Sequence, residues 1–215
     1  KSYGPPENLV LEDIEDLKPR EGEVLVEVYA ASLNFPDTLQ IEGKYQYQPP
    51  FPFIPGSEAG GVIKEISPNV KGFDIGDRVM ANPGIGAMAE LLCVPFERLR
   101  KIPDNMSFNT ASGFPMVYTT SYYALKQRAE LKSAETLLVL GSSGGVGVTA
   151  VELGKLMGAE VIAAASSEEK LDFAKNIGAD YLVNYSDGDL KTKIKELTNG
   201  KGADVIFDPV GGDLF

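Results

Sequence analysis

The chain has 215 residues, a formal net charge of −11, one cysteine and no histidine. This length accommodates two small domains. The acidic balance argues against a nucleic-acid-binding protein, because such proteins carry basic patches. The absence of histidine excludes His-based acid–base catalysis and His zinc sites, and one cysteine excludes an internal disulfide or a thiolate zinc cage. No apolar run reaches membrane-spanning length and no signal-peptide pattern opens the chain, so we expect a cytoplasmic protein.

The first half of the chain is rich in short strands and turn-forming residues. Alternating side chains predict a half-buried strand over residues 23–29, and two further strands are expected over 60–66 and 76–80. Proline and glycine interrupt the segments between them, as in Pro55–Gly56. Such punctuation between short strands indicates a small β-barrel or sandwich. Cys93 lies in the apolar run 91–94, and we interpret it as a core residue.

The second half opens with an apolar strand over residues 137–140, the glycine-rich run GSSGGVG over 141–147, and a helical pattern. A dinucleotide-binding fingerprint needs this order of strand, turn and helix, because glycine lets the backbone approach a pyrophosphate at the helix N-terminus. Set against G-x-G-x-x-G, the first position carries Ser142 and the others carry Gly144 and Gly147. A helix-entry turn without a ligand is the alternative. The side chains expected to face the core on this helix are Val146, Ala150, Leu153 and Met157.

Further strands and helices alternate after this turn. Strands are predicted over residues 161–165, 181–183 and 205–207, and the helices between them carry Leu171, Ala174 and Ile177 and then Leu190, Ile194 and Leu197. Gly178 is the expected C-terminal cap of the earlier helix, and Asn199–Gly200 end the later one. Four strands alternating with three helices indicate a parallel, doubly wound sheet, the half of a Rossmann fold that binds the adenine side of a dinucleotide. In the usual strand order, residues 205–207 lie beside 137–140.

The end of the strand over 161–165 decides the expected cofactor. An NAD-preferring site usually places a carboxylate there for the ribose 2′-hydroxyl, whereas this chain has Ser166 and Ser167, with Lys170 one helical turn further on. Hydroxyls and a lysine favour a 2′-phosphate, and therefore NADP(H). The alternative is helix capping, since either serine is a candidate N-cap. Glu168 and Glu169 argue against NADP(H).

Motifs in nearly the whole chain resemble one known family, the zinc-independent, ζ-crystallin-like quinone oxidoreductases of the medium-chain dehydrogenase/reductase superfamily. The matching segments occur in order and at the spacing of that family. They are residues 31–37, 43–45, 50–58, 76–79, 144–147 and 208–212.

The resemblance implies an α/β protein, with a GroES-like β-barrel catalytic domain over 1–119 and the N-terminal part of a Rossmann NADP(H)-binding domain over 120–215. It also implies NADPH in the cleft between the domains and a homodimer. Zinc-dependent relatives have a cysteine near Asn34 and a histidine at the position of Ser57, and this chain has neither. The family begins earlier and continues well beyond residue 215. We therefore expect a longer protein, or a partner that covers the open sheet edge at 205–207.

The resemblance also suggests site residues. Tyr45 and Asn34 are the expected catalytic residues, because a phenolic O–H and an amide N–H can stabilise a developing oxyanion without metal. Tyr45 could instead be a surface residue of its loop, Asn34 a turn residue and Thr120 a helix cap, while Asp37 is expected to hold the turn. The expected cofactor-binding residues are Thr120, Ser142, Ser143, Gly144, Gly145, Val146, Gly147, Ser166, Ser167, Lys170 and Tyr185.

The expected reaction is hydride transfer from NADPH to a small-molecule quinone, without zinc. Two alternatives stay open: reduction of a conjugated enone or alkenal double bond, and a structural or regulatory NADPH-binding protein without turnover.

Overall fold

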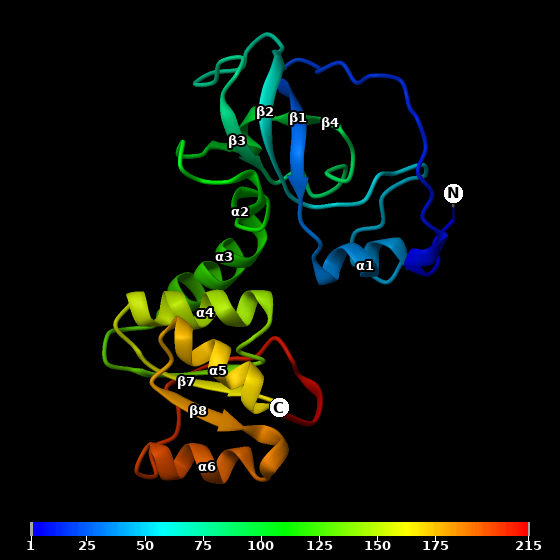
Figure 1. The fold of residues 1–215 in the computed structure, drawn as a ribbon. Coiled ribbons are helices and arrows are strands. Elements are labelled where there is room, and N and C mark those ends of the chain that lie inside the picture. The colour runs from blue at the N-terminus through cyan, green and yellow to red at the C-terminus, as the bar shows by residue number, and fades with distance from the viewer. Residues whose placement is uncertain (1, 215) are drawn as a thin grey trace. The chain divides into compact units, whose positions relative to one another are not determined.

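The computed structural model describes residues 2–214, which fall into two compact units, Lys1–Met116 and Val117–Phe215. Figure 1 shows a mainly β unit and a unit in which helices cover both faces of a sheet. Among the described residues, no helix is both long and apolar enough to cross a membrane.

The first unit contains a five-stranded antiparallel sheet with the order β4-β1-β2-β3-β5. The strands are β1 (Glu23–Ala31), β2 (Ala59–Ile66), β3 (Arg78–Ala81), β4 (Leu91–Pro95) and β5 (Leu99–Lys101). Alternate side chains of these strands face one apolar core, which includes Val24, Val26, Ile63 and Val94. The three predicted strands are confirmed, although β3 begins two residues later than expected because Gly76 adopts a positive φ and Asp77 ends the turn.

Three short helical segments complete the first unit or follow it. Helix α1 (Phe35–Ile41) lies between β1 and β2 in the chain. Helix α2 (Phe108–Ser112) packs closely against β2, since a Cβ on Gly60 would lie only 2.6 Å from the Phe108 carbonyl oxygen. The helix-prone stretch from 108 to 132 is broken after α2, because Gly113 ends it and Pro115 begins α3 (Pro115–Tyr122). A π-helical turn (Tyr123–Arg128) continues α3. Single 3₁₀ turns occur at Pro6–Asn8 and Phe96–Arg98.

The interpretation of Cys93 as a core residue is wrong. Leu92 and Val94 point into the core of the first unit, so strand alternation places Cys93 on the other face of the sheet, where it is only partly buried. Partial burial and the nearby Glu23 and Glu65 carboxylates raise the pKa of the Cys93 thiol to about 11. The apolar run over 91–94 suggested that all its residues are buried together, but Cys93 lies on the face of the sheet opposite to Leu92 and Val94.

The second unit is built on a parallel sheet with the order β8-β7-β6-β9. The strands are β6 (Thr136–Leu140), β7 (Glu160–Ala165), β8 (Tyr181–Asn184) and β9 (Val205–Phe207). Helices α4 (Gly145–Leu156) and α5 (Glu168–Ile177) cover one face, and α6 (Leu190–Leu197) covers the other (Figure 1). All four strands, the three helices and the position of β9 beside β6 confirm the sequence prediction. Short 3₁₀ turns follow β8 (Tyr185–Asp187) and β9 (Gly212–Leu214).

The predicted contact face of α4 is confirmed for Ala150, Leu153 and Met157, which belong to the core or pack against it, but not for Val146. The fully buried positions are Gly147, Thr149, Ala150, Val151 and Gly154, whereas Leu153 and Met157 are half-buried at the margin of the core and Val146 is half-buried outside it. A Cβ on Gly154 would lie 2.5 Å from Leu137 Cδ2, so small residues let the helix approach the sheet closely. The prediction missed the two glycines, Gly147 and Gly154, which share this face with Ala150 and Val151.

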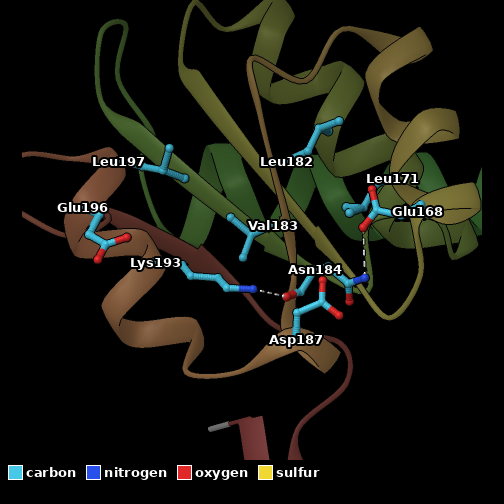
Figure 2. A pocket seen from close by; sticks show the side chains of 9 residues that line it. All are labelled: Glu168, Leu171, Leu182, Val183, Asn184, Asp187, Lys193, Glu196 and Leu197. Atoms are coloured by element: carbon cyan, nitrogen blue, oxygen red, sulfur yellow. Dashed lines mark hydrogen bonds between the residues drawn. The ribbon is translucent and has the colours of Figure 1, made fainter.

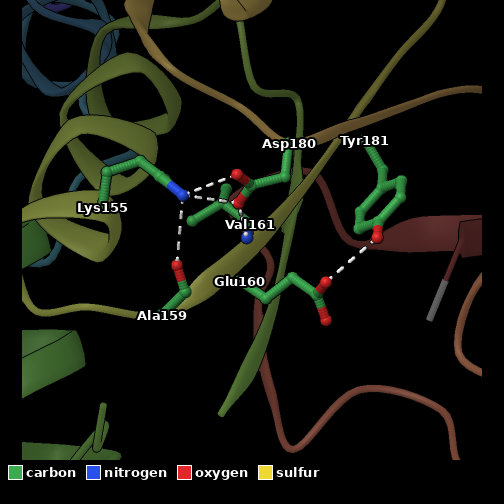
Figure 3. A network of polar contacts seen from close by, with 6 residues as sticks. All are labelled: Lys155, Ala159, Glu160, Val161, Asp180 and Tyr181. Carbon is green, nitrogen blue, oxygen red and sulfur yellow. Dashed lines mark hydrogen bonds and ion pairs between the residues drawn. The ribbon is translucent and has the colours of Figure 1, made fainter. Parts of the chain in front are cut away.

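An ion pair links the C-terminal end of α4 to Asp180, the residue before β8, and Asp180 also bonds the start of β7 (Figure 3). Lys155 Nζ lies 2.6 and 2.7 Å from the two carboxylate oxygens of Asp180, and Asp180 Oδ2 also accepts the Val161 N–H at 2.7 Å. Burial alone would raise the pKa of the Asp180 carboxyl, but the lysine and the backbone donor outweigh burial and lower it.

We expect Asp180→Asn to lower the free energy of unfolding by about 1–2 kcal/mol at pH 7, because a charge-assisted backbone cap and a partly exposed ion pair are weakened. A lowered pKa in the folded state stabilises the fold above the ordinary carboxyl pKa and loses this effect as the pH falls through the lowered value. The difference between the variant and the wild type should therefore shrink below about pH 4. Urea unfolding at pH 7 and pH 3 measures it, and an undiminished difference at low pH would contradict the role of the charge.

Candidate functional site

Two glycines of the turn after β6 have different structural roles. Gly141 adopts a backbone conformation that favours glycine, and Gly147 leaves no room for a side chain. Gly141 has a φ of +59°, in the left-handed region that favours glycine, and its carbonyl oxygen accepts the Gly144 N–H at 3.0 Å. A Cβ on Gly147 would lie 2.2 Å from the same oxygen and 2.9 Å from Ser142 Cα. The chain therefore reverses at Gly141. In the sequence alignment with G-x-G-x-x-G, the first position was placed one residue later, at Ser142.

The same turn presents open backbone at the start of α4. Gly144 and Gly145 are exposed, and a Cβ on Gly144 would meet only the Gly141 carbonyl oxygen, at 3.5 Å. The N–H groups of the first turn of a helix have no partner within the helix and point toward the N-terminal end, where they attract anions. Ser143 is half-buried beside them. Ser142 is fully buried, its N–H is donated to Ala164 O at 3.1 Å, and its hydroxyl has no hydrogen-bond partner.

The carboxyl end of β7 carries the predicted phosphate-reading residues. Ser167 is the N-cap of α5, and its hydroxyl accepts the Lys170 N–H at 3.4 Å. The Ser166 hydroxyl accepts a hydrogen bond from Lys170 Nζ at 2.9 Å, so the lysine side chain turns back toward the end of the strand. The capping alternative therefore applies to Ser167, while Ser166 and Lys170 form a separate pair. An open hollow of about 570 Å³ is lined by Ser143, Glu169, Lys170, Asp172, Phe173 and Asn176.

Glu168 is hydrogen-bonded to Asn184, as Figure 2 shows. Asn184 Nδ2 donates to Glu168 Oε1 at 3.0 Å, and Glu168 lines a different hollow of about 460 Å³ at the β8 edge. Ser186 Oγ donates to Ser166 O at 3.1 Å and ties the end of β8 to that of β7. Tyr185 is the first residue of the 3₁₀ turn that follows β8. Its side chain packs, partly buried, against the core on the α6 face of the sheet.

Thr120 is exposed in the middle of α3, and therefore does not cap that helix. Its neighbour Ser121 is fully buried instead, where its hydroxyl lies 2.8 Å from Thr149 Oγ1 and donates to Val146 O at 2.8 Å.

In the first unit, Asn34 lies at the start of α1 as its N-cap residue. The Asp37 carboxylate accepts the Asn34 N–H at 2.8 Å, which confirms that Asp37 holds this turn. The Asn34 side chain is part of a polar cluster that the sequence reasoning did not identify. Its amide nitrogen lies 2.8 Å from Glu58 Oε1, 3.2 Å from Ser32 Oγ and 3.4 Å from Ser57 Oγ. We call Ser32, Asn34, Ser57 and Glu58 the Glu58 cluster.

Tyr45 lies just after the C-terminal end of α1. Gly43 has a φ of +70° and reverses the chain, and the Tyr45 N–H is donated to Leu39 O at 3.2 Å. The Tyr45 side chain is half-buried, and its hydroxyl makes no hydrogen bond within residues 2–214. Next to Asn34, Leu33 is 79% and Phe35 is 75% exposed, so two large apolar side chains are open to a ligand beside this polar group.

Comparisons with known proteins agree with this arrangement. Residues 20–104 match the family model of the alcohol dehydrogenase GroES-like domain, and residues 145–215 match that of the zinc-binding dehydrogenase. The "Quinone oxidoreductase-like protein 2 homolog" of Nematostella vectensis is 41% identical over 90% of this chain and 53% of its own length. The crystal structure of Escherichia coli quinone oxidoreductase complexed with NADPH is 32% identical, with a TM-score of 0.92 over 99% of this chain and 65% of that one.

The chain belongs to the quinone oxidoreductase-like group of the medium-chain dehydrogenase/reductase superfamily. A GroES-like domain followed by a Rossmann-type parallel sheet is the fold of this superfamily, as expected from the sequence. Another solved member, CurK enoyl reductase, is 28% identical, with a TM-score of 0.91 over 99% of this chain and 66% of that chain. The chain spans between about half and two thirds of the length of these relatives.

The side-chain amide of Asn34 lies among the Ser32 and Ser57 hydroxyls and the Glu58 carboxylate, while the Asp37 carboxylate accepts its backbone N–H. Among residues 2–214, no three histidine, cysteine, aspartate or glutamate side chains are grouped so that they could hold a metal ion together.

Proposed function

We propose that a full-length protein containing this chain is an oxidoreductase that transfers a hydride from NADPH to a quinone, without zinc. The observation that carries the proposal is the open glycine turn at the N-terminus of α4, in the same unit as the Ser166–Lys170 pair. A substrate domain over 1–119 and a cofactor domain over 120–215 are part of this proposal.

The residues of the second unit fit a dinucleotide phosphate. The exposed Gly144 and Gly145 leave room that a Cβ would fill, and the first-turn N–H groups of α4 are donors for a pyrophosphate. We assign the pyrophosphate to Ser143, Gly144, Gly145 and Val146, with Ser142 and Gly147 shaping the turn from its buried side. Thr120 is proposed to contact the nicotinamide end. NADPH, when bound, supplies the hydride, and the protein supplies binding and orientation.

The choice of NADPH over NADH rests on charge at the end of β7. Lys170 Nζ and the Ser166 hydroxyl form a donor pair for a 2′-phosphate, with Ser167 and Tyr185 beside it. Glu168 is bonded to Asn184, so it does not oppose the phosphate from this position. Glu169 and Asp172 line the same hollow as Lys170. Their negative charges would repel a 2′-phosphate, and the positive charge of Lys170 must outweigh that repulsion.

The first unit supplies the donors for the substrate. The Tyr45 O–H has no partner in the described chain, so it is available to an oxygen on which negative charge develops. One N–H of Asn34 is bonded to Glu58 at 2.8 Å, on the side where Ser32 also lies, and the remaining contact of the nitrogen is the longer one to Ser57 Oγ at 3.4 Å. We propose that the second N–H also faces the substrate oxygen. The exposed Leu33 and Phe35 favour an apolar, planar acceptor.

Activity of the full-length protein tests these roles. We expect Tyr45→Phe and Asn34→Ala each to lower kcat with a quinone about tenfold, less than the hundredfold that loss of a fully enclosed oxyanion donor can cause. The Kd for NADPH should change little, because neither residue is assigned to the cofactor. Tyr47→Phe is the matched control, since Tyr47 is an exposed tyrosine of the same loop. Unchanged kinetics in both variants would contradict the assignment.

Reduction of a conjugated enone is the second candidate, favoured by the similarity to CurK enoyl reductase. The same cofactor and the same oxyanion donors serve both acceptors, because an enone carbonyl and a quinone oxygen both gain negative charge. A comparison of kcat/KM for benzoquinones and for alkenals distinguishes the two.

A further inference from the structure

Glu58 is a fully buried carboxylate, with 0% of its surface exposed, and it joins three separate segments of the first unit. Its Oε1 accepts hydrogen bonds from Asn34 Nδ2 at 2.8 Å and from the Ser32 hydroxyl, both in the loop between β1 and α1. Its Oε2 accepts the N–H of Met116 in the first turn of α3, at 2.7 Å. A buried carboxylate is costly unless donors surround it, and three donors satisfy this one.

The contact between Glu58 and Asn34 has a directional consequence. A side-chain amide is planar, and its two N–H bonds diverge at a fixed angle. Once one N–H is held by a charged acceptor at 2.8 Å, the direction of the other is set. Ser32 Oγ lies 3.2 Å from the nitrogen but donates to the same Glu58 oxygen, so it belongs to the side of the first N–H. The remaining contact of the nitrogen is a weak one, with Ser57 Oγ at 3.4 Å.

We infer that Glu58 is a positioning residue, which aims the second N–H of Asn34 at the oxygen of the acceptor substrate. Ser57 holds this hydrogen loosely when no substrate is bound, and a substrate oxygen replaces it. The inference rests on the proposed function, because it needs Asn34 to face the substrate. Glu58 itself touches no substrate, since it is fully buried.

Glu58→Gln is the test variant because it keeps the size of the side chain and removes one acceptor. A glutamine has one acceptor oxygen and one NH₂ group, so it must set a donor against either Asn34 Nδ2 or the Met116 N–H. Glu65→Gln is the control, because Glu65 is exposed on β2, the strand that Glu58 immediately precedes, and its replacement changes the net charge equally.

A double-mutant cycle separates positioning from a general structural role. We expect Glu58→Gln and Asn34→Ala each to lower kcat about tenfold at saturating NADPH, with the Kd for NADPH unchanged. The double variant should lose no more than about tenfold, because Glu58 acts only through Asn34. Multiplied losses, close to a hundredfold in the double variant, would overturn the inference. So would a normal kcat in Glu58→Gln when Asn34→Ala is impaired.

A second measurement does not depend on activity. In ¹⁵N-labelled full-length protein, the side-chain amide of Asn34 is assigned by its disappearance in Asn34→Ala. We expect one slowly exchanging amide hydrogen that becomes fast in Glu58→Gln and stays slow in Glu65→Gln. Fast exchange in the wild type would overturn the inference even if Glu58→Gln fails to fold. A normal kcat in Asn34→Ala together with slow exchange would instead overturn the proposed role of Asn34 and, with it, the role of Glu58 in the reaction.

Discussion

Gly147→Ala should lower the free energy of unfolding by about 3 kcal/mol or more, because the added methyl group would overlap backbone atoms. The new Cβ would lie 2.2 Å from Gly141 O and 2.9 Å from Ser142 Cα, and both are backbone atoms that cannot swing aside. In a helix without such a clash, alanine is more favourable than glycine by about 1 kcal/mol. A net loss of stability in Gly147→Ala would therefore be caused by the clash.

Urea unfolding of the wild type and the variant measures the effect through the shift of the midpoint. Gly144→Ala is the matched control, because its Cβ would meet only one atom, at an ordinary 3.5 Å. It should unfold like the wild type and yet bind NADPH more weakly, since its methyl group occupies the space assigned to the pyrophosphate. A Gly147→Ala protein within about 0.5 kcal/mol of the wild type would show that the turn is not as tight as described.

Lys170→Ala should weaken NADPH binding about ten- to a hundredfold and leave NADH binding almost unchanged. A charge-assisted hydrogen bond contributes about 1.5–3 kcal/mol, which corresponds to this range of Kd. Lys170 Nζ already lies 2.9 Å from Ser166 Oγ, at the strand end where an NAD-preferring enzyme would carry a carboxylate.

Titration of both cofactors by fluorescence gives the two dissociation constants. Lys175→Ala is the control, because Lys175 is an exposed lysine in the last turn of the same helix. Equal weakening of NADPH and NADH would mean that Lys170 does not read the 2′-phosphate. A loss as large in Lys175→Ala would attribute the effect to net charge alone.

Strands β1, β2 and β3 of the first unit and all four strands of the second were predictable because their patterns are local, whereas β4 and β5 were not predicted. Alternation over 23–29 and short apolar runs such as 161–165 identify strands without knowledge of their neighbours. The cap of α5 at Gly178 was equally predictable, since a φ of +117° there calls for glycine. The family resemblance then supplied the order of the domains.

What could not be predicted depends on contacts between distant segments. The face of α4 includes Gly147 and Gly154, whose importance is visible only when Gly141 and Leu137 are placed against them. Cys93 was misassigned because an apolar run does not tell which face of a strand is covered. Glu58 was missed because a single glutamate after Ser57 gives no indication of burial, and its donors come from residues 32, 34 and 116.

The central claim is zinc-independent hydride transfer from NADPH, and one assay tests it most directly. The full-length protein is treated with a chelator, its metal content is measured, and NADPH absorbance at saturating cofactor is followed as a benzoquinone is added. The account predicts quinone-dependent loss of NADPH absorbance, at the same rate before and after metal removal, with less than one zinc per ten chains. Tight NADPH binding without oxidation by any quinone or enone, or activity that disappears with the metal and returns with zinc, would contradict it.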